Sequence, residues 1–231
     1  MIQGHYITAI VAAAGSSTRM GRPKQWLDLC GESVLAHTLC ALQQSVVDEI
    51  IVAIRPEDEE AVRGVLVKYG IDKTKALVYG GQTRQQSVLA ALAAVSPQAT
   101  LIAVHDGARP LVTPELIARV AALAARTGAA APGIPMKDTC KCVDENGRVV
   151  DTPDRRTLRA VQTPQIFDAT LYRRAVETAV CTGGDYTDDC QVIERTGHAV
   201  FLCDGDPDNL KITTPEDVLV AVAVLEGRKA L

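Results

Sequence analysis

Aromatic residues are scarce in this chain, which has one tryptophan, five tyrosines and two phenylalanines among its 231 residues. Hydrophobic residues still make up 47% of the sequence, so the core must be built mainly from alanine, valine, isoleucine and leucine. Such a core suits helices layered on a largely parallel sheet better than an aromatic-rich β-sandwich. The length is near the upper end for one domain, and we expect a single α/β domain over residues 1–231.

Excess positive charge and long apolar runs are also missing. The formal net charge is −4, so no general field attracts nucleic acid or an anionic membrane surface. No run of about 18 apolar residues is present to span a bilayer, and the N-terminus lacks the basic and apolar regions of a signal peptide. We therefore expect neither a nucleic-acid nor a membrane partner, and an anionic ligand needs a local cluster of arginine and lysine.

The cysteines form neither a metal-binding nor a disulfide pattern. Their number, seven, is odd, their spacing is scattered, and no CxxC pair occurs. Because zinc sites use closely spaced thiolates, this distribution argues against one. We expect reduced, mostly buried thiols and a cytoplasmic protein.

Several motifs of catalysis and nucleotide binding are absent. There is no GxSxG, and the four histidines form no HxxxH or HxH pair, which argues against a hydrolase. Neither the P-loop GxxxxGK(S/T) nor the dinucleotide fingerprint GxGxxG occurs, which argues against P-loop enzymes and dinucleotide oxidoreductases.

What is present is an apolar run that opens into a cationic loop. Residues 7–14 predict a buried strand, which breaks at Gly15 into small and hydroxylated residues, and Arg19, Arg22 and Lys24 follow. A first strand that opens into such a loop is a common way to hold phosphate through backbone amides and cations. The alternative for each cation is an ordinary exposed side chain.

Strand and helix signals alternate along the rest of the chain. Apolar runs predict further strands at 50–54, 76–79, 101–105, 129–134 and 199–203. Capping patterns predict helices that begin near Ser33, Pro56, Gln86, Thr113, Asp168, Thr187 and Thr214. This order predicts an open, mainly parallel α/β sheet, whose ligands bind outside the carboxyl ends of the strands.

The segment 138–156 interrupts this order. Asn146-Gly147 is a strong signal for a type I′ turn between weakly alternating strands at 139–143 and 148–152. A hairpin this polar buries little and is marginal alone. It is either a solvated surface hairpin or an arm that packs on a partner subunit.

Polar residues follow several of the predicted strands. Asp106 comes after the strand 101–105, where a carboxylate can hold Mg²⁺ beside a phosphate or, alternatively, cap a turn. Arg109 can clamp a phosphate bidentately or form a surface ion pair. We interpret His105 as a satisfied core histidine, and we regard Lys211, before the helix cap at Thr214, as a weak signal alone.

A glycine pair, Gly80-Gly81, follows the strand 76–79 and leads into Gln82 and Arg84. Glycines there let a ring or a backbone approach closely, and Ser87 in the next helical turn could contact a base edge. The alternative is an ordinary turn with a serine at a helix start.

Together these residues are lysines, arginines and one carboxylate, without a nucleophile. They suit transfer of a nucleotidyl group to a phosphate acceptor, because that acceptor is already ionised near pH 7, with a second pKa of about 6, and needs no general base. Cations and Mg²⁺ would lower the repulsion between the anions and stabilise charge on the α-phosphate.

Seven motifs, in order, resemble those of the 2-C-methyl-D-erythritol 4-phosphate cytidylyltransferase family of the non-mevalonate isoprenoid pathway. They are AAAGSSTRMGRPKQ, GGQTRQQSV, VHDGARP, IPMKDT, AVQTPQIF, YTDD and DNLKITTPED. The resemblance implies a Rossmann-like nucleotidyltransferase fold, with helices on both faces of a mainly parallel sheet. A β-hairpin arm at about residues 136–158 would protrude and join a homodimer. The implied reaction takes CTP and methylerythritol phosphate, requires Mg²⁺, and gives 4-diphosphocytidyl-2-C-methyl-D-erythritol and pyrophosphate.

The resemblance also implies roles for individual residues. The implied catalytic residues are Arg19, Lys24 and Lys211. The implied nucleotide-binding residues are Ala13, Ala14, Gly15, Gly81, Gln82, Arg84, Ser87 and Asp106, with Asp106 also near the metal. The implied binding residues for methylerythritol phosphate are Arg109, Thr139, Arg155 and Thr163, where Thr139 and Arg155 come from the partner's arm. Ser17 departs from the family, since many members have a second glycine at that position.

Two other functions compete with this one. A sister enzyme would make another CDP-polyol, for example from ribitol 5-phosphate, and would differ on the acceptor side, at Thr139, Arg155 and Thr163. A nucleotide-binding or regulatory protein without turnover would lack Lys24, Asp106 or Lys211, and all three are present.

Overall fold

The first apolar run forms the central strand of the sheet. β1 (Ile7–Ala12) is almost wholly buried and pairs in parallel with β4 (Glu49–Ile54) and β6 (Leu101–Asp106). The structure, a computed structural model, describes residues 4–15, 23–183 and 186–230. β1 ends before the predicted limit at residue 14, although the Ala13 amide still donates a hydrogen bond of 2.9 Å to the Ala53 carbonyl.

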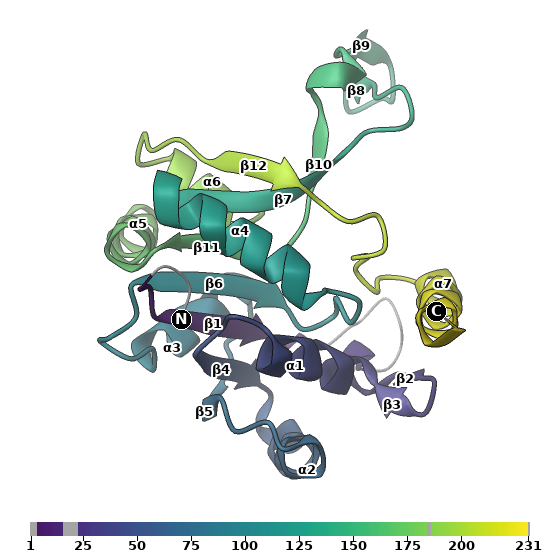
Figure 1. The fold of residues 1–231 in the computed structure, drawn as a ribbon. Coiled ribbons are helices and arrows are strands. Elements are labelled where there is room, and N and C mark those ends of the chain that lie inside the picture. The colour runs from purple at the N-terminus through teal and green to yellow at the C-terminus, as the bar shows by residue number, and fades with distance from the viewer. Residues whose placement is uncertain (1–3, 16–22, 184–185, 231) are drawn as a thin grey trace.

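The main sheet of the described residues has eight strands, in the order β10-β7-β11-β6-β1-β4-β5, with β12 paired to β7 (Figure 1). The remaining strands are β5 (Thr74–Tyr79), β7 (Ala129–Pro135), β10 (Arg159–Val161), β11 (Gln165–Asp168) and β12 (Phe201–Asp204). β10 and β11 run antiparallel to their neighbours, whereas the other pairings are parallel. The predicted mainly parallel sheet is therefore confirmed, and the two antiparallel strands are additions to it.

Helices cover both faces of this sheet, as expected. One face carries α1 (Val34–Gln44), α2 (Glu59–Tyr69) and α4 (Pro114–Thr127). The other carries α3 (Arg84–Ala93), α5 (Ala169–Thr182) and α6 (Asp189–Glu194). The last helix, α7 (Pro215–Ala230), packs separately against the short strand β2 (Asp28–Leu29), which pairs with β3 (Glu32–Ser33), and α7 lies to one side of the sheet in Figure 1.

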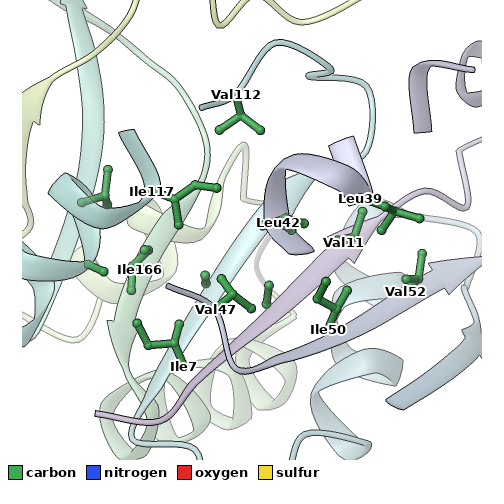
Figure 2. Packing of buried hydrophobic residues seen from close by; sticks show 14 of the residues in the cluster. Ile7, Val11, Leu39, Leu42, Val47, Ile50, Val52, Val112, Ile117 and Ile166 are labelled. Atoms are coloured by element: carbon green, nitrogen blue, oxygen red, sulfur yellow. The ribbon is translucent and has the colours of Figure 1, made fainter. Parts of the chain in front are cut away.

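Alternation along β1 divides the core into two layers. Ile7 and Val11 face α1 and α4, and Ile10 faces the opposite layer, because successive side chains of a strand point to opposite faces. Figure 2 shows Val11 beneath Leu39 and Leu42 of α1. Each of these leucines is fully buried, which contributes about 1.5–3 kcal/mol per side chain relative to an exposed one. This layer fixes β1, whose carboxyl end leads into residues 13–15.

Most predicted helix boundaries follow from their caps. The Ser33 hydroxyl accepts from the Ala36 amide at 3.2 Å, and α4 lies between its Thr113 cap and Gly128, whose φ is +82°. α3 begins earlier than the predicted Gln86, because Thr83 caps it and Gln86 reaches back to complete a capping box.

The predicted hairpin is present, and it protrudes from the body of the molecule (Figure 1). Its strands, β8 (Cys142–Val143) and β9 (Val149–Asp151), are shorter than predicted, and the 3₁₀ turn η4 (Arg155–Thr157) follows. The predicted type I′ turn is wrong, because Gly147 has φ +78° but Asn146 does not have a positive φ. Instead, the Asp144 carboxylate accepts from the Asn146 and Arg148 amides, each at 3.0 Å, and this bonding shapes the turn.

Candidate active site

A cavity of about 550 Å³ opens at the carboxyl ends of β1 and β6. In the sheet, β1 lies between β4 and β6. The strand that follows β1 in this sheet, β4, is its neighbour on one side, and the later strand β6 is its neighbour on the other, so the strand order reverses at β1. Open α/β sheets bind ligands at such a point. The lining residues are Ala12, Ala13, Ala14, Gly15, Lys24, Gln25, Gly81, Gln82, Thr83, Arg84, Ser87, Asp106, Gly107, Ala108 and Lys211. The structure thus brings together the predicted residues of the β1 loop, the β5–α3 loop, the end of β6 and the segment around Lys211.

The β1 loop supplies the floor of this cavity. Ala13, Ala14 and Gly15 continue from β1 and line it, as predicted. Arg19 and Ser17 lie outside the described residues. Lys24 begins the 3₁₀ turn η2 (Lys24–Trp26), which returns the chain to the cavity wall.

The β5–α3 loop approaches this floor closely because it begins with glycines. A Cβ on Gly80 would overlap the Ala14 side chain and lie 2.6 Å from the Ser87 hydroxyl oxygen. That hydroxyl accepts from the Gly81 amide at 3.2 Å and donates to the Thr83 carbonyl at 3.0 Å. Ser87 therefore shapes the loop in this structure, in addition to lining the cavity.

Asp106 lies at the centre of the charged part of the cavity. Its position opposite Ala12 in the β1–β6 register puts its carboxylate at the edge of the sheet. Oδ2 is 2.8 Å from Lys211 Nζ, and Oδ1 accepts from Arg84 Nε at 3.1 Å. Burial would raise the pKa of Asp106, but the charges of Arg84 and Lys211 outweigh it and hold that pKa well below its usual range. Asp106 is therefore ionised throughout the neutral range.

Arg84 is shared between two carboxylates. Besides Asp106, it contacts Asp189 at the start of α6, with Nη1 2.7 Å from Oδ2. The hydroxyl of the buried Tyr172 donates to the other Asp189 oxygen at 2.5 Å. The sequence places Asp189 in the YTDD motif but does not indicate a role for it. Its contact with Arg84 arises because the fold brings α6 next to α3.

The segment that carries Lys211 is fixed to the end of β6. The Ile212 amide donates to the Ala108 carbonyl at 2.8 Å, and the fully buried Asn209 donates through Nδ2 to the Thr163 carbonyl at 2.9 Å. The Lys211 side chain itself is 42% exposed on the cavity side of this anchor. Its backbone is held, while its ammonium can exchange Asp106 for a phosphate.

The predicted acceptor residues lie outside the cavity lining. Arg109 is directly behind Asp106, with Nη1 donating to the Asn209 carbonyl at 2.8 Å, and its buried Nε has no hydrogen-bond acceptor among the described residues. The Thr163 hydroxyl accepts from the Asp106 amide at 3.1 Å and lies 3.1 Å from His105 Nδ1. Thr139 and Arg155 are exposed on the arm, where Arg155 donates to the Lys137 carbonyl at 2.7 Å.

His105 is a core residue, as expected, but it is only partly satisfied. It is fully buried, and its Nε2 has no hydrogen-bond partner among the described residues. Burial lowers the pKa of His105 to about 4, with the positive charge of Arg109 acting in the same direction. A neutral imidazole therefore lies behind Asp106 at physiological pH.

The donor set of the cavity fits a magnesium ion bound mainly through a ligand. The described residues contain no group of three or more carboxylate, imidazole or thiolate side chains arranged around a common point. Among the described residues that line the cavity, Asp106 is the one carboxylate, whereas Asp189 contacts Arg84 from outside the lining. Because Mg²⁺ commonly takes one or two carboxylates together with substrate phosphates and water, one such carboxylate is sufficient.

This fold and site define an α/β nucleotide-binding enzyme of the nucleotidyltransferase class. The sequence profile of the 2-C-methyl-D-erythritol 4-phosphate cytidylyltransferase family matches residues 7–227, and the chain belongs to that family.

Individual relatives agree with this assignment. The 2-C-methyl-D-erythritol 4-phosphate cytidylyltransferase of Caldanaerobacter subterraneus is 43% identical over 219 residues, which cover 93% of this chain and 96% of the relative. That of Desulforamulus reducens is 41% identical over 226 residues, which cover 96% of this chain and 97% of the relative. The crystal structure of 4-diphosphocytidyl-2C-methyl-D-erythritol synthase from Anaerococcus prevotii has a TM-score of 0.87 and 35% identity, covering 97% of this chain and all of that one.

Proposed function

We propose that this protein transfers the cytidylyl group of CTP to 2-C-methyl-D-erythritol 4-phosphate. The observation that supports this most directly is the Asp106 carboxylate between Arg84 and Lys211, at the mouth of a nucleotide-sized cavity. Family membership identifies the acceptor, and it does not favour ribitol 5-phosphate.

The reaction exchanges one phosphorus–oxygen bond for another. An oxygen of the acceptor phosphate bonds to the α-phosphorus of CTP, the bond from that phosphorus to the bridging oxygen breaks, and its electron pair leaves with pyrophosphate. The acceptor oxygen is already ionised, since the second pKa of a phosphate monoester is about 6, so the protein need not remove a proton. Its task is to bring anions together and to stabilise the charge that gathers on the α-phosphate.

Three cations are assigned to this task. Lys24 and Lys211 both line the cavity, one from η2 and one from the segment before α7. In this proposal Lys211 exchanges Asp106 for the α-phosphate, and Lys24 and Arg19 bind the remaining phosphates. Asp106 would hold Mg²⁺, which when bound neutralises charge on the phosphates.

The cytidine is assigned to the loops that lie around the end of β1. Ala13, Ala14 and Gly15 offer backbone groups to the nucleotide, while Gly81 and Gln82 lie opposite and are open to the cavity. Because glycines keep this side of the cavity narrow, a flat pyrimidine ring fits there. Ser87 and Arg84 support the base and the ribose side from the start of α3.

The acceptor site is assigned to two subunits. Arg109 and Thr163 lie behind Asp106, whereas Thr139 and Arg155 are on the arm and do not line the cavity of their own chain. A homodimer in which each arm reaches the partner's cavity would complete the site. The arm exposes Val143, Val149 and Val150, each more than half uncovered, which supports a partner on this surface.

A cytoplasmic location belongs to the same proposal. All seven cysteines are free, which suits a reducing compartment. The expectation that they are mostly buried is wrong, because only Cys190 is buried. Separately, no helix of the described chain is long and apolar enough to cross a bilayer.

The test is pyrophosphate release by the purified protein with CTP and each of two acceptors, methylerythritol phosphate and ribitol 5-phosphate. We expect release with the first acceptor only, and none when Mg²⁺ is chelated. Faster pyrophosphate release with ribitol 5-phosphate than with methylerythritol phosphate would make ribitol 5-phosphate the assigned acceptor. Binding of CTP by calorimetry without any release would indicate a nucleotide-binding protein without turnover.

A further inference from the structure

Asp58, which does not line the cavity, has a buried carboxylate that accepts four hydrogen bonds from the side chains of three residues. This residue ends the 3₁₀ turn η3 (Pro56–Asp58), which leads from β4 into α2, and it is 5% exposed. Each of its oxygens accepts two hydrogen bonds from side chains. An aspartate at this position needs only a backbone partner to cap a helix, so four side-chain donors are more than that role requires.

Two of these donors come from the turn that carries Lys24. Trp26 Nε1 donates to Oδ1 at 2.6 Å, and Gln25 Nε2 donates to Oδ2 at 3.1 Å. Both residues directly follow Lys24 in η2, and Gln25 also lines the cavity. Asp58, which does not itself line the cavity, therefore holds this turn through two of its three side chains.

The other two donors fix the carboxylate itself. Arg55 donates to both oxygens, from Nε at 2.7 Å and from Nη2 at 2.8 Å. Arg55 directly follows β4, so this bidentate pair ties Asp58 to the end of a central strand. Although burial acts to raise the pKa of Asp58, the bonds from Arg55 and Trp26 hold it below its usual value. The result is a rigid connection from the sheet, through one carboxylate, to the residues beside Lys24.

Such a connection has a function because lysine is a flexible cation. Its side chain carries about 2 kcal/mol of rotamer entropy, and it reaches a phosphate reliably only when its backbone is fixed. Lys24 is the first residue of η2, and it lines the cavity together with Gln25. The contacts of Gln25 and Trp26 with Asp58 set the position and direction from which the Lys24 side chain enters the cavity.

We propose that Asp58 is a positioning residue for Lys24, acting through Gln25 and Trp26 to set the ammonium for catalysis. This inference rests on the proposed function, in which Lys24 binds the triphosphate. A merely structural role would instead make Asp58 a link between the end of β4 and η2 that stabilises the fold without any specific effect on Lys24.

The test is a double-mutant cycle between Asp58→Asn and Lys24→Ala. In the otherwise unchanged enzyme, we expect Asp58→Asn to lower kcat by about 10- to 100-fold, as small misplacements of catalytic groups do. Each oxygen of Asp58 accepts a hydrogen bond from η2, and asparagine replaces one of these oxygens with an amide nitrogen, which cannot accept. At least one of the two bonds to η2 is therefore lost. In the Lys24→Ala background the same substitution should change kcat less than about twofold, because the group that it positions is gone.

A readout other than activity is built into the turn. Trp26 is the only tryptophan of the chain, so its fluorescence reports on the Asp58 contact directly. We expect Asp58→Asn to shift the emission of Trp26, because the hydrogen bond from Trp26 Nε1 to the carboxylate is changed. Glu57→Gln is the matched control. Glu57 also pairs with Arg55, at 3.1 Å, but its side chain is 62% exposed and has no contact with η2. The Glu57→Gln substitution should change neither kcat nor the fluorescence emission of Trp26.

Each outcome decides between the alternatives. Equal losses of kcat in both backgrounds, or a normal kcat in Asp58→Asn with a shifted Trp26 emission, would overturn the positioning role and leave the proposed function intact. Normal turnover in Lys24→Ala would overturn the assignment of Lys24 and the positioning role with it. If Asp58→Asn does not fold, Trp26→Phe replaces it in the cycle, since that change removes only one bond to Oδ1. A twofold to tenfold loss of kcat is then expected, again only where Lys24 is present.

Discussion

Lys211 Nζ lies 2.8 Å from Asp106 Oδ2, which joins the segment before α7 to the end of β6. The pair is exposed on the lysine side and buried on the aspartate side. The carboxylate thus occupies the place on the ammonium that the proposed function assigns to a phosphate. The entry of CTP becomes an exchange of one anion for another, which costs less than placing an unpaired charge in the cavity.

Replacing Lys211 with alanine should abolish most turnover without unfolding the protein. We expect kcat to fall by about 10²–10³-fold, as when one charge-stabilising group is removed from an active site, with a smaller change in KM for CTP. Steady-state pyrophosphate release measures both parameters. Lys68→Ala is the control, since Lys68 pairs with Glu32 on the surface at 2.9 Å and should leave kcat unchanged. Wild-type turnover in Lys211→Ala would remove this residue from the mechanism.

A methyl group on Gly80 should weaken nucleotide binding. The added Cβ would lie 2.6 Å from the Ser87 hydroxyl oxygen and overlap Ala14, so the β5–α3 loop must move away from the β1 loop. We expect the Kd for CTP, measured by calorimetry, to rise by at least about tenfold, or 1.4 kcal/mol.

Gly64→Ala is the comparison for this substitution. Gly64 lies within α2, and a Cβ there meets no atom within 4 Å. Alanine at such a helical position should stabilise the protein by up to about 1 kcal/mol and leave CTP binding unchanged. A Gly80→Ala protein with normal affinity would show that the close approach of the two loops does not matter for the nucleotide.

Stability should fall on the acid side because of His105. Its pKa is about 4 in the folded protein, whereas an unfolded histidine has a pKa of about 6.5. Between these values the unfolded chain binds a proton that the folded chain does not, so the free energy of unfolding decreases as pH falls. The loss should be complete near pH 4 and amount to about 3 kcal/mol, with no contribution from His105 above pH 7.

Urea unfolding of the parent and of His105→Asn between pH 4 and 7.5 measures this effect. Asparagine can still place a polar atom near the Thr163 hydroxyl but does not titrate. The difference in free energy between the two proteins should therefore shrink steadily as the pH is lowered. A difference that stays constant with pH would mean that His105 is protonated without opening the core.

A charge on the arm should weaken the proposed dimer. Val150 is 56% exposed on β9, and Val150→Lys would place an ammonium in the apolar surface that the partner is expected to cover. Sedimentation velocity should then show dissociation at protein concentrations where the parent protein is dimeric, and kcat/KM for methylerythritol phosphate should decrease. Val67→Lys, at an 84% exposed site on α2, should change neither the oligomeric state nor kcat/KM for methylerythritol phosphate. A monomeric parent protein would contradict the dimer itself.

The sequence predicts the parallel strands well because each is an apolar run between turn signals. β10 and β11 lack such a run. Gln165, the first residue of β11, is buried because its amide oxygen accepts from the backbone amides of Asp189 and Cys190 at the start of α6. The hydrophobic periodicity of the sequence cannot reveal a polar residue that is buried by a helix far away in the chain. In β10, Arg159 is exposed and the strand is too short for a pattern.

The same distinction applies to the site. Asp106, Gly81 and Lys24 follow strands or loops directly, so their place at one edge of the sheet can be inferred from the chain order. Asp189 and Asp58 cannot be inferred in this way, because their importance depends on which side chains from other elements reach them. Local sequence identifies the groups that face a ligand more readily than the groups that hold them.

The base of the arm is closed by sheet pairing before the arm leaves the body. Pro135 at the end of β7 lies opposite Arg159 at the start of β10, and two further pairs continue inward. Everything between these two residues is therefore a self-contained insertion whose ends are already joined. The segment can be treated as an interchangeable cassette. If the arm binds the partner and the acceptor as proposed, arms of different length or sequence grafted between 135 and 159 should change these two properties and leave the cavity at the ends of β1 and β6 as it is.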